Sequence, residues 1–245
     1  MAHPRFFCSL DLHTGTRLPL PDDIAHHAVR VLRLRDGADI VLFNGQGGQY
    51  AAKLMLSGDK PSAELLEHAP ADGGLAGQIT VVQGLPSGDK MDWVVEKAVE
   101  VGTARVLPVA AQRSVLQLTG ARLEKRLQHW RRISQAASEQ CGRNRLMPVE
   151  SPLPLAQCLA QHVSAESLTL FCDPDAPISL SDLLPTPVAH ITLLIGPEGG
   201  WSPQEQEAAL AAGARPVRFG ARVLRTETAG IALVSAIAAL QAWND

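Results

Sequence analysis

A strand-like apolar run that stops at a glycine cluster, and is followed at once by a helix signal, is the feature that most constrains the fold. Residues 191–195 (ITLLI) are continuously apolar and end at GPEGG, residues 196–200. Ser202 and Glu205 have capping-box spacing around Pro203, so a helix is expected to begin at residue 203. A strand that a glycine loop joins to a helix N-terminus is typical of open α/β sheets, which bind ligands at that edge.

Strand and helix signals alternate through most of the chain, which predicts an α/β domain with a parallel sheet. Apolar runs predict strands at residues 79–85, 105–109, 168–172, 191–195 and 216–219. Helical spacing of apolar residues predicts helices at residues 89–102, 121–140 and 228–243. The last helix is apolar nearly all round, so we expect it to be buried in the domain or in a dimer interface.

The first part of the chain has a different pattern, typical of a small β-domain. Two β-prone runs within residues 39–57 flank Asn44-Gly-Gln-Gly-Gly, and Asn and Gly tolerate the backbone angles of a tight hairpin turn. Residues 68–78 are rich in Ala, Gly and Pro and are interpreted as a linker. We therefore expect two domains, residues 1–72 and residues 73–245.

Composition limits the function classes. The chain is 46% hydrophobic, yet it has no long apolar run and its first residues lack a signal-peptide pattern, so a cytoplasmic protein without a membrane segment is expected. No CxxC or paired-histidine spacing indicates a metal site, and reduced buried thiols are expected at the scattered cysteines Cys8, Cys141, Cys158 and Cys172. The net charge is −3, but residues 87–150 carry 11 basic and 7 acidic side chains, an excess that can attract a polyanion.

Two other segments could form a ligand site. GLPSGDK (residues 84–90) joins a strand to a helix, but its spacing is too short for a phosphate-binding P-loop and Asp89 would repel phosphate. Residues 219–233 (FGARVLRTETAGIAL) place Arg222, Arg225 and Glu227 ahead of the last helix, where Thr226 or Thr228 could cap it. This segment could be the second wall of one pocket, or only a capped turn with ordinary surface charge.

Several separated blocks together resemble one known family. The blocks IGPEGGW, FGARVLRTETA, GDKMDWVVEKAVEVG and EQCGR are similar to blocks of the small-subunit ribosomal RNA methyltransferase E family, in the SPOUT superfamily of knotted methyltransferases. The N-terminal RFF and the β-rich segment suit the PUA-like β-barrel domain of that family. The resemblance therefore covers most of the chain.

The resemblance implies a C-terminal SPOUT domain with a parallel sheet and a deep trefoil knot, a homodimer, and S-adenosylmethionine as the cofactor. It implies N3-methylation of one uridine in 16S ribosomal RNA, either free or in the assembled small subunit. The cofactor is expected among three loops, with contacts from Leu170, Phe171, Cys172, Gly196, Pro197, Glu198, Gly199, Phe219, Gly220, Val223, Leu224, Arg225, Thr226, Thr228 and Ala229.

Methylation at uracil N3 requires loss of a proton and stabilisation of the negative charge that results. A carboxylate can take the proton and an arginine can stabilise the anion. Arg225 and Glu227 are the first candidates, and Glu198 is the second choice for the carboxylate.

Basic residues outside the cofactor loops are candidates for RNA contact. One face of the helix at residues 121–140 carries Lys125, Arg126, His129 and Arg132, which could equally be a solvated surface. The stronger candidates are Arg113, Arg143 and Arg145, and Lys90 is a further one. If these three arginines do not bind RNA, the N-terminal domain is the place to look, through Arg5, Arg30, Arg33 and Arg35. Two alternatives stay open: a noncatalytic RNA-binding module, and a SPOUT methyltransferase that acts on tRNA or on another rRNA base.

Overall fold

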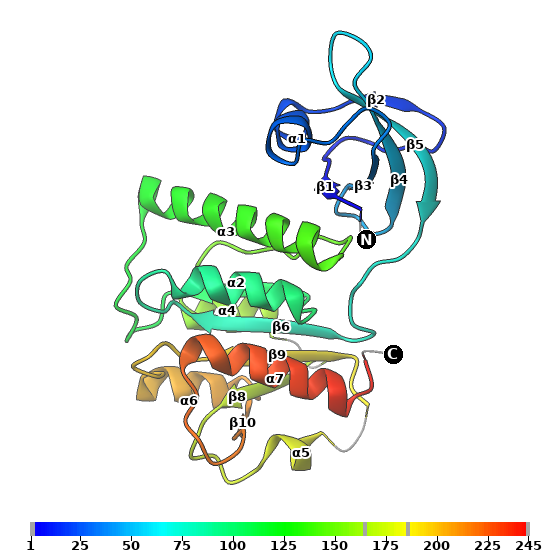
Figure 1. Ribbon diagram of the computed structural model, residues 1–245. Helices are drawn as coiled ribbons and strands as arrows, with labels where there is room; N and C mark the ends of the chain where they lie inside the picture. The colour runs from blue at the N-terminus through cyan, green and yellow to red at the C-terminus, as the bar shows by residue number, and fades with distance from the viewer. Residues whose placement is uncertain (1–2, 164–165, 185–186, 244–245) are drawn as a thin grey trace. The chain divides into compact units, whose positions relative to one another are not determined.

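The structure is a computed structural model that describes residues 3–163, 166–184 and 187–243 (Figure 1). The chain forms two compact units, each with its own core. The first contains Met1–Gly73 and Ser138–Leu146, and the second contains Gly74–Ala137 and Met147–Asp245. The last residues of helix α3 (Gly120–Cys141) thus belong to the first unit, although no sequence signal indicated this.

The first unit is built on a five-stranded sheet. The strands, in spatial order, are β1 (Arg5–Phe7), β3 (Asp39–Phe43), β4 (Gln49–Met55), β5 (Ser62–Ala69) and β2 (Arg17–Pro19). Only the β1–β3 pair is parallel. The sheet has two edges, β1 and β2, so the described strands of the expected PUA-like β-barrel domain form a half-barrel sheet.

The predicted hairpin is confirmed. β3 and β4 pair antiparallel, and the connecting turn places Gly45, Gly47 and Gly48 at positive φ. The Asn44 side chain accepts a hydrogen bond from the Gln46 N–H at 3.1 Å, as expected for Asn in a turn.

A short helical segment covers part of this unit. It consists of α1 (Asp22–His26) and the π-helix η1 (His27–Val31), whose last residues and the turn after them are exposed. Ile24 and Ala28 face inward and pack with Phe6, Leu42 and Leu54 in the core. A buried stripe this narrow leaves the rest of the segment open to solvent.

The second unit contains an entirely parallel sheet, as predicted. Its strands, in spatial order, are β10 (Arg215–Val217), β8 (Leu168–Cys172), β9 (His190–Ile195), β6 (Gln78–Gly84) and β7 (Arg105–Val109). The central strands are buried on both faces, which explains why they are continuously apolar rather than alternating.

Helices cover both faces of this sheet. Neighbouring residues of β9 point to opposite sides: Leu193 and Ile195 belong to the core beneath α2 (Lys90–Glu100) and α7 (Thr226–Leu240), whereas Leu194 belongs to the core beneath α4 (Leu155–His162) and α6 (Pro203–Ala211). Part of α3 packs on the first face through Leu127 and Trp130, and the short helix α5 (Leu180–Leu183) adds to the same core. The result is a three-layer α/β/α unit.

The last helix is buried on one side only. Gly230, Leu233, Val234 and Ile237 are buried against the sheet, while Leu240 is half exposed. None of the helices in the described residues is both long and apolar enough to cross a membrane. Cys8 and Cys158 are buried as expected, but the expectation is wrong for Cys141, which is exposed on the last turn of α3.

Candidate active site

A cavity of about 480 Å³ lies at the carboxyl edge of the parallel sheet. Its walls come from the loops after β8, β9 and β10 and from the first turns of α2, α6 and α7. Most of the predicted cofactor residues line it, namely Phe171, Cys172, Gly196, Pro197, Glu198, Phe219, Val223, Leu224, Arg225, Thr226 and Ala229. The three loops that the sequence picked out are thus brought together around one space.

Four predicted cofactor residues do not line the cavity. Leu170 is fully buried in the core under the sheet, because its side chain points to the face opposite Phe171. Gly199 and Gly220 lie in the loops themselves, and the Thr228 N–H donates to the Arg225 carbonyl within the first turn of α7.

Other residues line the cavity without having been predicted as cofactor contacts. They are Lys90, Asp173, Pro174, Ile195, Gly200, Trp201, Gln206, Val217, Arg222 and Leu233. Seven of the ten lie within two positions of a predicted cofactor residue, so extending each loop by a few positions would have found them. Lys90 and Gln206 come from helices, and only the position of those helices beside the loops brings them to the cavity.

The GPEGG loop is held by contacts on both sides. The predicted capping box of α6 is confirmed, with reciprocal bonds between Ser202 and Glu205, and the Glu205 carboxylate also accepts from the Gln112 N–H at 2.9 Å. Gly200 closes a tight turn at φ 67° through a bond from its N–H to the Pro197 carbonyl. Arg113 donates to the Gly199 carbonyl at 3.0 Å.

The loop also approaches the end of β6 so closely that only glycine fits there. A Cβ at Gly84 would lie 2.5 Å from Pro197 Cδ and 2.7 Å from Pro197 N. Real Cβ atoms do not come so close to other heavy atoms, so Gly84 allows the two strand ends to meet. The segment that leads from β6 into α2 therefore begins directly against the GPEGG loop.

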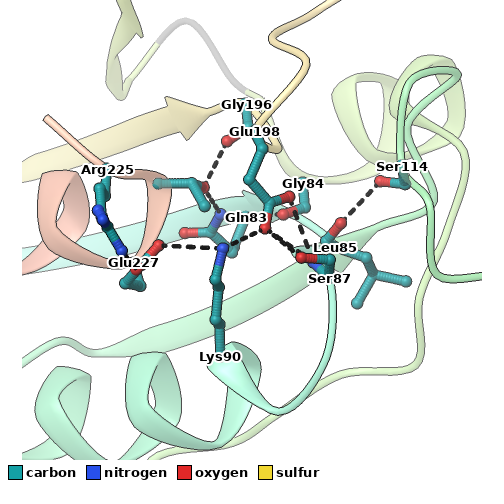
Figure 2. A network of polar contacts seen from close by, with 11 residues as sticks. Gln83, Gly84, Leu85, Ser87, Lys90, Ser114, Gly196, Glu198, Arg225 and Glu227 are labelled. Atoms are coloured by element: carbon teal, nitrogen blue, oxygen red, sulfur yellow. Dashed lines mark hydrogen bonds and ion pairs between the residues drawn. The ribbon is translucent and has the colours of Figure 1, made fainter. Parts of the chain in front are cut away.

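Glu198 ties these two segments together (Figure 2). Its carboxylate accepts from the Ser87 N–H at 3.0 Å, the Ser87 hydroxyl at 2.6 Å and Lys90 Nζ at 2.6 Å. Burial acts to raise the pKa of Glu198, but the hydrogen bonds from Lys90 and Ser87 outweigh it and lower the pKa to about 2. Glu198 is therefore a fixed anion at neutral pH and a weak proton acceptor.

Thr226 has a different role from the predicted one. The first turn of α7 has no side-chain cap, because the N-cap residue is Arg225 and its side chain makes no capping bond. Instead the Thr226 hydroxyl donates to the Gly196 carbonyl at 2.6 Å and accepts from Gln83 Nε2 at 2.8 Å. Thr226 thus joins α7 to the ends of β9 and β6, so the predicted capping role is wrong.

Glu227 and Arg225 both lie at the cavity but in different surroundings. The Glu227 side chain is 15% exposed, and its Oε2 is buried without a hydrogen-bond partner among the described residues. The Arg225 side chain is 82% exposed, and its Nη1 lies 4.0 Å from Glu227 Oε1. Glu227 is therefore a shielded carboxylate whose Oε2 has no partner among the described residues, and Arg225 is an exposed cation beside it.

The segment between β10 and α7 forms the open wall of the cavity. Val223 is 79% exposed, and Phe219 and Arg222 are also exposed. No backbone hydrogen bond ties residues 219–224 to another part of the described chain, whereas the GPEGG loop is bonded to Ser87, Arg113 and Thr226. Cys172, at the end of β8, lines the same cavity. Burial raises the pKa of its thiol to about 12, so this group is neutral.

The predicted RNA-binding arginines of the first unit fall into two groups. Arg5 donates to Gln49 and Asn144, both at 2.5 Å, and Arg145 pairs with Asp72 at 3.1 Å. Arg143 is 95% buried, since only 5% of its surface is exposed. In contrast, the exposed residues Arg30, Arg33 and Arg35 make no side-chain bond or ion pair with any described residue.

The basic face of α3 is partly neutralised within the second unit. Arg126 bonds to Asp89 and lies 3.7 Å from Asp92, and His129 bonds to Asp92 at 2.8 Å. Both acidic residues come from the start of α2, so these two side chains connect helices. Lys125 and Arg132 remain exposed.

Comparison with known families and proteins agrees with this arrangement. Residues 75–238 match the RNA methyltransferase domain family, and residues 20–65 match the RNA methyltransferase PUA domain family. The ribosomal RNA small subunit methyltransferase E of Bacillus subtilis is 31% identical, over 95% of this chain and 95% of its own length. The chain belongs to the ribosomal RNA small subunit methyltransferase E family.

Solved structures support the same assignment. The methyltransferase E of Neisseria gonorrhoeae, in a crystal structure bound to S-adenosyl methionine, is 35% identical with a TM-score of 0.90, covering 98% of each chain. A putative methyltransferase of Legionella pneumophila in complex with the same cofactor has a TM-score of 0.88 at 28% identity, over 99% of this chain and 98% of that one. As a member of the methyltransferase E family, the chain shares the fold of these proteins over nearly its whole length.

Proposed function

We propose that this protein transfers a methyl group from S-adenosylmethionine to N3 of one uridine in 16S ribosomal RNA, in the cytoplasm. The observation that carries the proposal is the cavity of about 480 Å³ at the carboxyl edge of the sheet, in a chain whose structural relatives were solved with this cofactor. Its size is within the range of about 300–1,000 Å³ usual for small-molecule sites. A noncatalytic RNA-binding module would have no use for such a cavity.

The residues of the cavity suit the cofactor. Phe171, Ile195 and Leu233 offer apolar surface for a planar base, and the backbone of the glycine loops offers polar groups for the ribose. Asp173, Glu198 and Glu227 supply negative charge on the same lining. When bound, S-adenosylmethionine supplies a methyl group on a positively charged sulfur, which carboxylates attract and which becomes a neutral thioether after transfer.

Glu227 is the better candidate for accepting the N3 proton. A base needs free lone pairs and a site shielded from bulk water, and the Glu227 carboxylate has both. Glu198 has the opposite properties, because its oxygens already accept three donors and its pKa is about 2. Loss of the N3 proton to Glu227 leaves N3 with the electron pair that forms the new bond to the methyl carbon.

Arg225 is the candidate for stabilising the uracil anion. Its guanidinium lies next to Glu227 on the open wall and is free to move toward the carbonyl oxygens that share the negative charge. Removing a donor of this type typically costs about 10²–10³-fold in kcat.

The exposed arginines of η1 and of the segment directly after it are the proposed RNA contacts of the first unit. Arg30, Arg33 and Arg35 have no partner among the described residues to give up, whereas Arg5 and Arg145 would have to leave theirs and Arg143 would have to become exposed. In the second unit, Arg113 lies beside the cofactor loop and could hold the RNA near the cavity.

We also propose the deep trefoil knot and the homodimer. The chain leaves the edge strand β10 and returns to the centre of the sheet, where Thr226 bonds to Gly196 and α7 packs on β9 and β6. A chain that threads through a loop must follow a course of this kind.

Two exposed apolar side chains support the homodimer. Trp93 of α2 and Leu240 of α7 are exposed on two helices that pack together, which supports an interface there. Ile231→Glu should then give monomers in size-exclusion chromatography, whereas Ile237 is fully buried and belongs to the core.

The experiment that tests the function is a methylation assay on purified small subunits and on free 16S RNA from a strain lacking this enzyme. Nuclease digestion followed by mass spectrometry should detect 3-methyluridine only when both protein and S-adenosylmethionine are present. Glu227→Gln is the matched inactive control, and it should still bind S-adenosylhomocysteine. Methylation of tRNA, or of another base in the rRNA, would contradict the proposed reaction and favour a different methyltransferase of the same fold.

A further inference from the structure

Gln83 is a polar side chain at a position where the pattern of its strand predicts an apolar one. The face of β6 that packs beneath α2 and α7 carries Ile79 and Val81, and Gln83 is the next residue on the same face. The Gln83 side chain is completely buried, and the residues that line the cavity do not include it. A buried amide costs free energy unless its polar atoms are bonded, so its hydrogen bonds indicate its role.

The Gln83 amide donates two hydrogen bonds at the place where three segments meet (Figure 2). Its Nε2 donates to the Gly84 carbonyl at 2.9 Å and to Thr226 Oγ1 at 2.8 Å, and the Thr226 hydroxyl donates to the Gly196 carbonyl at 2.6 Å. Gln83 lies opposite Ile195 in the parallel pair of β6 and β9, so Thr226 joins the ends of both strands. The opposite orientation of the amide would place its oxygen against the Gly84 carbonyl, so the network fixes the nitrogen on the Thr226 side.

The first turn of α7 is attached to the rest of the protein through Thr226. Among the described residues, its side chain makes the only hydrogen bonds from this turn to another segment. The residues before the turn, 219–224, have no backbone hydrogen bond to another part of the described chain. Thr226 stands between Arg225 and Glu227, the two residues proposed for catalysis. Its hydroxyl therefore sets where these two neighbours lie.

We propose that Gln83 is a positioning residue that acts through Thr226 to hold Glu227 and Arg225 in place for methyl transfer. This inference rests on the proposed function, in which Glu227 takes the N3 proton and Arg225 stabilises the anion. Gln83 itself contacts neither the cofactor nor the RNA, because it is completely buried outside the cavity lining.

Apolar packing alone would not fix the direction of the catalytic side chains. A Cβ at Gly230 would lie 3.1 Å from Ile195 Cδ1, so this glycine brings α7 close to β9. Such contacts set the distance between the helix and the sheet, but they are non-directional. Successive side chains of a helix differ in direction by about 100°, so a rotation of the helix would turn them away from the cavity. Hydrogen bonds have a preferred direction, and the bonds of Thr226 to Gln83 and Gly196 therefore fix the rotation of α7 about its own axis.

The unpaired oxygen of Gln83 supports a role beyond stability. Its Oε1 is buried and has no hydrogen-bond partner among the described residues. An apolar side chain at this position would avoid the cost of an unpaired acceptor. The donor group is thus what the position requires, and a local rule broken in this way is typical of functional sites.

The test measures the methyl-transfer step itself, in single turnovers with saturating small subunits and S-adenosylmethionine. Gln83→Met removes the amide at similar length, and Thr226→Val removes the hydroxyl at similar shape. Thr192→Val is the matched control, because Thr192 is a buried polar residue of the neighbouring strand β9 and its hydroxyl bonds to Ser167 rather than to α7. Titration with S-adenosylhomocysteine and thermal unfolding report on the cofactor site and on the fold.

We expect the single-turnover rate of Gln83→Met to fall by about 10- to 100-fold, since a displacement of about 1 Å at the reacting groups can cost about 100-fold. Its affinity for S-adenosylhomocysteine should change by less than about threefold, because the lost interaction acts on the transition state. Thr192→Val should lower the melting temperature and leave the rate unchanged. The double variant Gln83→Met/Thr226→Val should be no slower than Thr226→Val, because the amide acts only through the hydroxyl.

Three results would overturn the inference. A wild-type rate in folded Gln83→Met would show that the amide positions nothing. A loss of S-adenosylhomocysteine affinity as large as the loss of rate would show that the pair shapes the cofactor cavity instead. Additive losses in the double variant would show that Gln83 does not act through Thr226.

A second comparison decides the matter if Gln83→Met does not fold. Thr226→Ser keeps the hydroxyl and should recover most of the rate that Thr226→Val loses, and equal rates in these two variants would reject the positioning role. Glu227→Gln separates this inference from the proposed function. An inactive Glu227→Gln with a wild-type rate in Gln83→Met would reject the positioning role alone, whereas a wild-type rate in Glu227→Gln would mean that the proposed base is wrong.

Discussion

The two walls of the cavity differ in how firmly they are built. The GPEGG loop is bonded to Ser87, Lys90, Gln112 and Arg113 through its own residues and the helix cap that follows it. The opposite wall, residues 219–224, has no backbone hydrogen bond to another described segment and exposes Val223 and Phe219. One wall is thus fixed by bonds within the protein, whereas the other is open to solvent.

The difference indicates which wall loses conformational freedom when a ligand binds. A preformed wall costs little conformational entropy on binding and sets the position of the ligand, while an open loop must lose freedom as it closes. The same contrast separates the arginines of the first unit, where Arg5 and Arg145 are bonded and Arg30, Arg33 and Arg35 are free. Substitutions in the bonded parts and in the open parts should therefore differ in how they change ligand or RNA affinity and the stability of the free protein.

The largest effect is expected in the fixed wall. A Cβ at Gly196 would lie 3.2 Å from Gly200 Cα and 3.3 Å from Trp201 N, so Gly196→Val must displace the turn that lines the cavity. We expect affinity for S-adenosylhomocysteine to fall by about 100-fold or more, or about 2.7 kcal/mol, in isothermal titration. Gly74→Val is the control, because a Cβ at Gly74 meets nothing within 4 Å. Unchanged affinity in a folded Gly196→Val protein would mean that this wall is not rigid.

The next effect concerns the free arginines. Changing Arg30, Arg33 and Arg35 to Ala removes cations that have no internal partner, so RNA affinity should fall and the slope of log K against log salt should flatten by about 2–3 units. Changing Arg5 and Arg145 to Ala should flatten the slope less and lower the melting temperature, because these side chains brace the first unit. If both sets change the slope equally, bonding within the protein does not decide which arginines bind RNA.

A smaller effect is expected on stability in acid. The pKa of Glu198 lies below its ordinary value of 4.5, so its ionised form stabilises the fold above that pH, and this contribution is lost as the pH falls from about 4.5 toward about 2. Glu198→Gln should therefore be less stable than wild type at pH 7, and the gap should close in this acid range. Urea unfolding at several pH values measures the gap, and a constant gap would show that charge is not its cause.

The smallest effect is expected in the open wall. Val223→Ala removes apolar surface that only a bound ligand could cover, so affinity for S-adenosylhomocysteine should fall by about three- to tenfold. The melting temperature of the free protein should not change, in contrast to Val217→Ala, which removes fully buried methyl groups from the neighbouring strand. A lower melting temperature for Val223→Ala would show that this loop is already packed without ligand.

Much of the fold could be predicted because its signals are local. The capping box, the hairpin turn and the buried strands depend on residues a few positions apart, and all of them were found at or near their predicted bounds. The open edges of the first sheet were not predicted, because closure depends on how distant strands meet. The assignment of residues 138–146 to the first unit has the same origin, since it requires contacts with residues such as Asp72 and Gly45.

The sequence by itself determined the family, the three loops that form the site, and the five strands and four of the helices (α2, α3, α6 and α7) of the second unit. Only the tertiary structure decided what individual side chains do there. Lys90 and Glu198 are 108 positions apart, and Thr226 meets Gln83 across 143 positions, so no spacing rule connects them. Side-chain roles at the site are set by which strand ends the parallel sheet brings together at one edge, and that depends on the packing of the whole unit.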